Sequence, residues 1–254
     1  YDRHDNIVLV TGGSAGIGAA TAILFAKEKA SVAIVGRNEV KLKEVAQICE
    51  NLGSKVLTIK ADISKETEAG TVVKRTVEKF GKLDVLVNNA GIVRFTGIAE
   101  DNILEVYDEI LNTNLRAVVQ ITHLAVPYLK KTKGNIINVS SICSTKVLWG
   151  GILTIYGISK AAMDHFTKST ALELGPFGVR VNSINPGVVK TEIVQKETLP
   201  KEILKKMNDY AIPSALGKDA ESDEIGDLMV YLASDKAKSI TGSIFFIDNG
   251  TLVH

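Results

Sequence analysis

Apolar stretches rich in β-branched residues alternate along the chain with amphipathic stretches of helical period. The apolar stretches are continuous rather than alternating, which indicates strands buried on both faces, as in a parallel sheet. The predicted strands cover Ile7–Val10, Val32–Val35, Lys55–Ile59, Val85–Asn88, Asn135–Val139, Val179–Ile184 and Ile244–Ile247. The predicted helices cover Gly16–Lys29, Glu39–Leu52, Glu66–Phe80, Asn102–Leu129, Ile155–Leu174 and Ser222–Ala233. Strands that alternate with helices predict right-handed crossovers around one central sheet.

Two architectures fit such a chain, a closed barrel and an open sheet. The glycine-rich turn after the first strand favours the open sheet, because cofactors bind there beside the first strand. The sequence therefore predicts an α/β fold with a doubly wound, Rossmann-like parallel sheet of seven strands, helices on both faces, and a single domain over residues 1–254. Residues 191–217 lack a clear period and contain Pro200, Pro213 and Gly217, so they are expected to form a substrate-binding lid.

Charge, cysteine content and hydropathy limit the kinds of partner and the cellular location that are expected for this chain. The net charge of +1 gives no broad basic surface for nucleic acid or anionic lipid. The two cysteines form no disulfide framework, which favours a reducing, cytoplasmic location. No apolar run approaches the roughly 20 residues that span a bilayer. The polar start is unlike a signal peptide. It lacks an initiator Met, so the alternative is that a targeting segment was removed.

A glycine-rich turn, Thr11-Gly12-Gly13-Ser14-Ala15-Gly16-Ile17-Gly18, follows the first strand and opens a helix. Gly12 permits a sharp turn, Gly16 lets the backbone approach a pyrophosphate, and Gly18 lets the helix pack close to the sheet. The helix N-terminus presents free N–H groups to phosphates, so Ser14 and Ile17 are also expected at the cofactor. The alternative is a tight turn without a ligand, which the position after the first strand of a βαβ unit disfavours.

The end of the second strand bears on the choice between NAD and NADP. An NAD-selective site places an acid there for the ribose 2′-hydroxyl, whereas this chain has Gly36 followed by Arg37. A guanidinium binds a 2′-phosphate with two charge-assisted hydrogen bonds, so NADP(H) is expected rather than NAD(H). The alternative for Arg37 is a solvent-facing side chain. Asp62 is a candidate acceptor for the adenine amino group or, equally, a helix N-cap.

Tyr156 and Lys160 stand four residues apart on a predicted helix, so both project from one face. A free tyrosine has a pKa near 10, too high for proton transfer at neutral pH. An ammonium ~4 Å away, at an effective dielectric of ~20, contributes about 4 kcal/mol, which would lower the pKa of Tyr156 towards neutrality. The alternative is an exposed lysine beside a half-buried tyrosine.

Several motifs in order resemble those of the short-chain dehydrogenase/reductase family, and the resemblance covers nearly the whole chain. The glycine turn matches the family's cofactor turn, and Asn88-Asn89-Ala90-Gly91 matches the motif after its fourth strand. Tyr156-Gly157-Ile158-Ser159-Lys160 matches its active-site pentad. Asn185-Pro186-Gly187-Val188-Val189-Lys190-Thr191 matches the segment that wraps the nicotinamide, and Ser239-Ile240-Thr241-Gly242-(x)5-Asp248-Asn249-Gly250 matches the final strand.

The resemblance implies roles that spacing alone does not give. Tyr156 would be the general acid in reduction, and Lys160 would lower its pKa and hold the nicotinamide ribose. Asn114 would anchor a water that links Lys160 to solvent, and Ser141 would hydrogen-bond the substrate oxygen. Further implied cofactor contacts come from Asn88, Ala90, Pro186, Gly187, Val188, Val189 and Thr191. No metal is implied.

The spacing from Ser141 to Tyr156 is about two residues longer than the usual family pattern. At the usual spacing Cys143 would take the serine's place. We assign the role of the active-site serine to Ser141, because the motif at the end of the preceding strand fixes its position. The two extra residues are then expected in Lys146–Ile152. Ser144 remains an alternative for the serine.

The resemblance also implies an oligomer, often a tetramer, with the helices that carry Asn114 and Tyr156 between subunits. Candidate substrate walls are largely apolar, which favours a lipophilic ketone or alcohol such as a steroid-like, terpenoid or 3-oxoacyl compound. These candidates are Val93, Phe95, Ile142, Trp149, Ile193, Val194, Met207 and Tyr210. A non-catalytic nucleotide-binding protein and an isomerase or dehydratase remain alternatives on the same fold.

Overall fold

The computed structural model describes residues 6–193, 199–209 and 212–253. Seven parallel strands form one open sheet in the order β3-β2-β1-β4-β5-β6-β7. The strands are β1 (Ile7–Thr11), β2 (Ser31–Gly36), β3 (Val56–Lys60), β4 (Val85–Asn88), β5 (Asn135–Val139), β6 (Arg180–Pro186) and β7 (Ile244–Ile247). The predicted doubly wound sheet is confirmed, and the barrel is excluded because β3 and β7 are free edges. The strand order reverses between β1 and β4, where open α/β sheets place their ligands.

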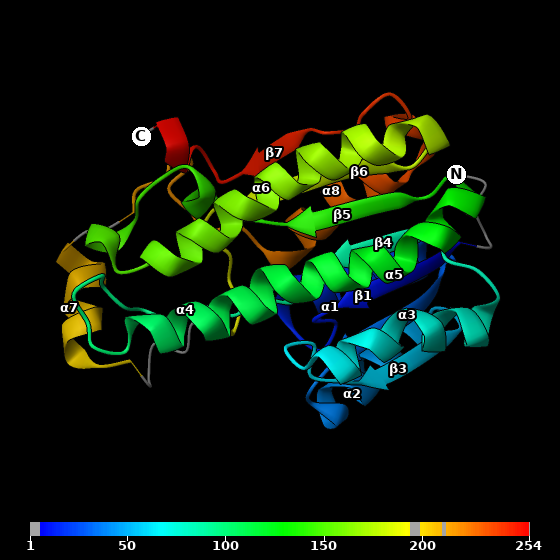
Figure 1. The fold of residues 1–254 in the computed structure, drawn as a ribbon, viewed down its shortest axis with the longest axis horizontal. Helices are drawn as coiled ribbons and strands as arrows, with labels where there is room; N and C mark the ends of the chain where they lie inside the picture. Colours follow the sequence, from blue (N-terminus) through cyan, green and yellow to red (C-terminus); the bar gives the residue numbers. More distant parts are fainter. Residues whose placement is uncertain (1–5, 194–198, 210–211, 254) are drawn as a thin grey trace.

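The inner strands are largely buried on both sides because each face of the sheet has its own core. In β1, Val8 and Val10 face one core while Ile7 and Leu9 face the other. The first core packs against α1 (Gly16–Lys27), α2 (Glu39–Asn51) and α8 (Ser222–Ala233), and the second against α3 (Glu66–Phe80), α5 (Ala117–Thr132) and α6 (Thr154–Leu174). Figure 1 shows α5 and α6 in front of the sheet. None of the helices in the described ranges has the length and apolar character that crossing a bilayer requires.

The helix predicted over Asn102–Leu129 is present, but it contains one π-helical turn. The structure has α4 (Ile103–Leu111), a π-helical turn over Asn112–Arg116, and then α5. A wider turn of this kind inserts a residue into the helix and is common at functional sites. Here it contains the buried Asn114, which turns towards the segment after β4. The hydrophobic period continues through the turn, so the sequence did not reveal it.

The region predicted to be irregular, residues 191–217, contains a helix, α7 (Lys201–Asp209). The nine residues of α7 bury no side chain fully, but its apolar residues, Ile203, Leu204 and Met207, have helical spacing, a signal that the sequence analysis missed. The helix lies at one end of the molecule (Figure 1) and packs against the short turn Trp149–Gly151. Residues 194–198 and 210–211 of the expected lid lie outside the described residues.

Candidate active site

A cleft of about 500 Å³ opens at the carboxyl edge of the sheet, at the reversal between β1 and β4. It is continuous from the ends of β2 and β3 to the start of α6. Its lining includes Gly12, Ser14, Gly16, Ile17, Gly36, Arg37, Asp62, Asn89, Ala90, Ser141, Tyr156, Lys160, Pro186, Gly187, Val189 and Thr191. The cleft therefore brings together most of the residues that the sequence singled out.

The glycine turn leaves no room for side chains. A Cβ on Gly18 would lie 2.2 Å from the Gly12 carbonyl oxygen, and one on Gly12 would lie 2.9 Å from Ala90 Cα. Gly12 also has a φ of +68°, a conformation that disfavours L side chains. Helix α1 begins at Gly16 without a side-chain cap, so its first N–H groups face the cleft. This bare helix start beside a glycine cradle fits a pyrophosphate.

Arg37 and Asp62 lie together at the far end of the cleft, at the ends of β2 and β3. Arg37 is exposed, and its charge helps lower the pKa of Asp62. Burial is the largest influence on Asp62 and acts to raise the pKa, but hydrogen bonds from Ser64 and nearby cations outweigh it. One Asp62 carboxylate oxygen accepts from both the Ser64 backbone N–H, at 3.1 Å, and the Ser64 hydroxyl, at 2.7 Å. The N-cap alternative for Asp62 is wrong, because α3 begins at Glu66 with Lys65 as its N-cap residue; Asp62 instead holds the turn at Ser64 and lines the cleft.

The segment after β6 lies across the glycine turn. The side chain of Thr191 would be 3.1 Å from a Cβ placed on Gly16. Glu192 forms an ion pair with Lys41 in the first turn of α2, on the opposite side of the cleft. Pro186, Gly187 and Val189 line the same wall, whereas Val188 lines a smaller neighbouring cavity.

Tyr156 and Lys160 share one face of α6 and both line the cleft. Lys160 is 3 % exposed, and its ammonium donates to the Val139 carbonyl oxygen at 2.8 Å. The ammonium lies 5.5 Å from the centre of the Tyr156 ring. An ammonium has three donors, so Lys160 retains capacity to bind a hydroxyl in the cleft.

The pKa of Tyr156 differs from the sequence expectation. Burial raises the pKa of Tyr156 above its ordinary value, and the Ser141 hydroxyl lowers it only in part. Burial also lowers the pKa of Lys160 to about 8. The predicted lowering of the pKa of Tyr156 by Lys160 is wrong for the protein alone, because burial raises this pKa and only the Ser141 hydrogen bond lowers it. The phenol is consequently protonated at neutral pH, which is the form that can donate to a carbonyl oxygen.

The pKa of Lys160 predicts a pH profile. A lysine carries its charge below its pKa, so the ammonium is present below pH about 8 and is lost above it. We expect kcat/KM for NADPH, which reports the free protein, to be level below this pH and to fall about tenfold per unit above it. A profile that stays level to about pH 10 would contradict the assignment of Lys160 to cofactor binding.

Ser141, rather than Ser144, lies on the cleft wall. The Ser141 hydroxyl accepts from the Cys143 backbone N–H at 3.1 Å. Its hydrogen bond with the Tyr156 phenol lowers the pKa of Tyr156. Ser144 is instead bonded to Asn185, whose amide donates to its hydroxyl at 3.0 Å. The two extra residues between Ser141 and Tyr156 were expected in Lys146–Ile152. This stretch contains the turn Trp149–Gly151, in which all three residues have positive φ.

Two alanine variants separate the serines. Ser141→Ala is expected to reduce kcat by about 100-fold, because a hydrogen bond to the reacting oxygen is lost. Ser144→Ala removes only an acceptor for Asn185 and is expected to change kcat by less than about fivefold. Steady-state kinetics of both variants test this, and the reverse order would move the assignment to Ser144.

Asn114 and Asn88 lie behind the cleft wall. Asn114 is fully buried; its amide donates to the Ile92 carbonyl at 2.9 Å and accepts from the Ile92 N–H at 2.8 Å. Asn114 and the Lys160 ammonium meet at Gly91, where a Cβ would lie 3.3 Å from Asn114 Oδ1 and 3.6 Å from Lys160 Nζ. Asn88 does not line the cleft as expected, because its amide donates inward to Thr122 and Asn138.

Asn89, which the sequence analysis did not assign, lines the cleft instead of Asn88. Its amide donates to the Thr11 carbonyl at 2.9 Å and so ties the end of β4 to the glycine turn. Successive strand residues point to opposite faces, so either asparagine could have faced the cleft, and only the register of β4 decides between them.

Apolar side chains enclose Tyr156 at the near end of the cleft. The cluster contains Val93, Ile142, Leu148 and Leu153 with Phe95, Cys143, Trp149, Tyr156, Ile212 and Leu252 packed against it. Four of the predicted wall residues are therefore brought together here. Ile193 lines the cleft, and Met207 lines the smaller cavity beside Trp149. Val194 and Tyr210 lie outside the described residues, and the contacts of Ile212 and Leu252 had no signal in the sequence.

Known proteins resemble this chain over nearly its whole length. A family model described as enoyl-(acyl carrier protein) reductase matches residues 12–251. A 3-oxoacyl-(acyl-carrier-protein) reductase of Thermotoga maritima is 34% identical, over 97% of this chain and 98% of that protein. A 3-alpha-(or 20-beta)-hydroxysteroid dehydrogenase of Mycobacterium tuberculosis is 36% identical, over 97% and 89%. The structure of a short-chain dehydrogenase from Burkholderia cenocepacia in complex with NADP superposes with a TM-score of 0.87 at 32% identity, covering 97% of this chain and 98% of that one.

Proposed function

Because this chain belongs to the short-chain dehydrogenase/reductase family and is an oxidoreductase, we propose that it uses NADP(H) to interconvert a lipophilic carbonyl compound and its secondary alcohol. The observation that carries the proposal is the single cleft that contains Ser141, Tyr156 and Lys160 together with the glycine cradle. A protein that only binds nucleotides has no use for these three side chains at one end of the cleft.

The residues present fit a bound NADP(H). The glycine turn and the start of α1 would hold the pyrophosphate, Arg37 the 2′-phosphate, and Lys160 the ribose next to the nicotinamide. Asp62, Ala90, Val189 and Thr191 would line the cofactor between these points. The Burkholderia cenocepacia relative binds NADP, which supports this choice over NAD. When bound, the cofactor supplies or accepts the hydride.

The chain's own residues handle the proton. In reduction, Ser141 donates a hydrogen bond to the carbonyl oxygen and Tyr156 delivers its proton to the same atom as the alcohol forms. Lys160 stabilises the phenolate that remains, and the fixed Asn114 connects Lys160 to the backbone at Ile92. Burial keeps the phenol protonated at neutral pH, which is the form that the reduction step requires.

The apolar cluster around Tyr156 favours a lipophilic substrate. Its walls come from segments far apart in the chain, from Val93 to Leu252, and include Ile212 between α7 and α8. Relatives that are named for 3-oxoacyl and steroid substrates fit the same chemistry. We further propose that residues 191–217, with α7, form the lid over this end.

A homo-oligomer, expected to be a tetramer from the family resemblance, belongs to this proposal. An open groove on α4 and α5 is lined by Tyr107, Leu111, Leu115 and Val119. Tyr107 and Val119 are 42% and 43% exposed, which is high for large apolar side chains at one face. A second copy of the chain would cover this groove.

The test of the proposed function is a screen of ketones, quinones and 3-oxoacyl thioesters with NADPH and with NADH. We expect NADPH to be consumed in a one-to-one ratio with the alcohol formed. Binding of NADPH without consumption against any carbonyl would support a nucleotide-binding protein instead. Product formed without net NADPH consumption would support an isomerase or dehydratase.

A further inference from the structure

A buried carboxylate that no proposed step uses lies one helical turn beyond Lys160. Asp164 is 9% exposed and faces the sheet from α6. One of its oxygens accepts from the Asn185 amide at 2.8 Å, and the other lies 3.2 Å from the Ser183 hydroxyl, which shares its single proton between Asp164 and the Asn185 carbonyl oxygen. A carboxylate away from water is costly unless a charge or strong hydrogen bonds compensate it. Two neutral donors compensate Asp164 only in part.

Asn185 connects this carboxylate to the strand end that carries Ser141. The same Asn185 amide nitrogen also lies 3.2 Å from the Ser141 carbonyl oxygen and 3.0 Å from the Ser144 hydroxyl, so its two hydrogens are shared among Asp164, Ser141 and Ser144. The Asn185 carbonyl oxygen accepts from the Ser183 hydroxyl at 2.7 Å, which fixes the amide's orientation. Asp164 therefore holds, through one side chain, the backbone of the residue proposed to bind the substrate oxygen.

Asp164 also acts on Lys160, which lies one helical turn before it on α6. The two residues are four apart on α6, so their side chains leave the same face of the helix. The titratable groups that act on Lys160 are Asp164 and Cys143; Asp164 raises the pKa of Lys160 against the larger lowering effect of burial. The polar neighbours from the other elements, Asn114 and Ser140, are neutral.

We propose that Asp164 is a positioning residue for the proposed carbonyl chemistry, anchoring the Ser141 strand end through Asn185 while keeping the Lys160 ammonium charged. This inference rests on the proposed function. The two roles are separable, because the first depends on hydrogen bonds through Asn185 and the second on the charge of Asp164.

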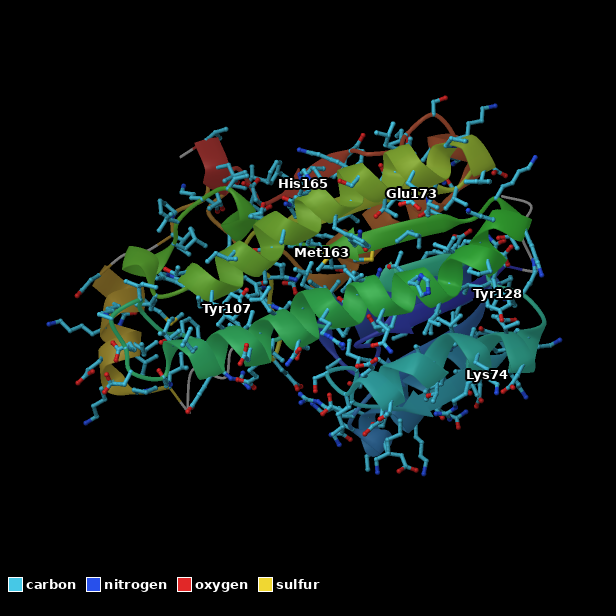
Figure 2. All side chains as sticks on the ribbon, viewed as in Figure 1. Lys74, Tyr107, Tyr128, Met163, His165 and Glu173 are labelled. Atoms are coloured by element: carbon cyan, nitrogen blue, oxygen red, sulfur yellow. The ribbon has the colours of Figure 1, made fainter. Side chains whose placement is uncertain are left out.

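Two variants separate the roles. Asp164→Asn keeps the shape and removes the charge, so the alkaline limb of kcat/KM for NADPH should move down by about one pH unit. Asn185→Ala keeps the charge and cuts the link, so kcat should fall about tenfold while the alkaline limb stays in place. Glu173→Gln is the matched control, since it removes a carboxylate from an exposed position of the same helix (Figure 2) and should change neither quantity.

A direct titration gives a readout without turnover. In protein labelled with ¹³C at lysine Cε, NMR follows the Lys160 ammonium, and Lys160→Met assigns its signal. The Asp164→Asn variant should titrate about one unit lower than the unaltered protein. If the unaltered protein turns over no carbonyl but this shift is present, the proposed function fails while the charge coupling stands.

Two results would overturn the inference. An unchanged Lys160 titration in Asp164→Asn removes the charge role, and an unchanged kcat in Asn185→Ala removes the anchoring role. Circular dichroism checks that each variant folds. If Asp164→Asn does not fold, Asp164→Glu replaces it. Because Asp164→Glu retains the charge, it should preserve the alkaline limb of kcat/KM and lower kcat. Loss of the alkaline limb in this variant would contradict the proposal.

Discussion

Tyr156→Phe is expected to lower the rate of carbonyl reduction by about 1,000-fold or more, while the Kd for NADPH changes by less than about threefold. The variant removes one hydroxyl that the proposed reaction uses as its proton donor and leaves the ring in the apolar cluster. Stopped-flow or steady-state NADPH oxidation measures the rate, and fluorescence titration measures the Kd.

Tyr128→Phe is the matched control for this experiment. Tyr128 lies near the end of α5 (Figure 2), outside the cleft, so losing its hydroxyl should leave the rate unchanged. Full turnover in Tyr156→Phe would remove the catalytic assignment and leave a nucleotide-binding protein.

Gly36→Asp is expected to shift the preference from NADPH towards NADH by about 100-fold or more. A carboxylate at the end of β2 would repel the 2′-phosphate and could accept from a ribose 2′-hydroxyl, a difference of about 3 kcal/mol. The ratio of kcat/KM values for the two cofactors measures the shift. A variant that still prefers NADPH would show that this strand end does not set the preference.

The structure adds a steric condition to this second experiment. A Cβ on Gly36 would lie 3.0 Å from the Ser14 hydroxyl oxygen, so Ser14 has to move slightly in any variant. Gly36→Ala introduces the same Cβ without a charge and isolates that effect. We expect Gly36→Ala to weaken both cofactors alike, and only Gly36→Asp to change their ratio.

The fold was predictable because its signals are local. Continuous apolar strands, a glycine turn after the first of them and amphipathic helices each follow from side chains within a few residues of one another. The spacing of Tyr156 and Lys160 likewise follows from helical geometry. Even the assignment of Ser141 rests on its place directly after β5.

The features that the sequence did not predict depend on interactions between residues that are far apart in the chain. Whether Lys160 or burial controls the pKa of Tyr156 depends on how much water the surrounding side chains exclude, which a sequence does not specify. The choice of Asn89 over Asn88 depends on strand register, and the contact of Asp164 with Asn185 joins residues 21 positions apart. The π-helical turn before α5 interrupts no hydrophobic period.

Trp149 is the chain's single tryptophan, and its ring packs 5.9 Å from that of Phe95 in the cluster around Tyr156. All indole emission from this protein therefore originates in this cluster, which we propose to be the substrate end of the site. The intrinsic fluorescence spectrum is consequently a built-in, label-free reporter of what occupies that end, and it is separate in position from the adenosine end near Arg37.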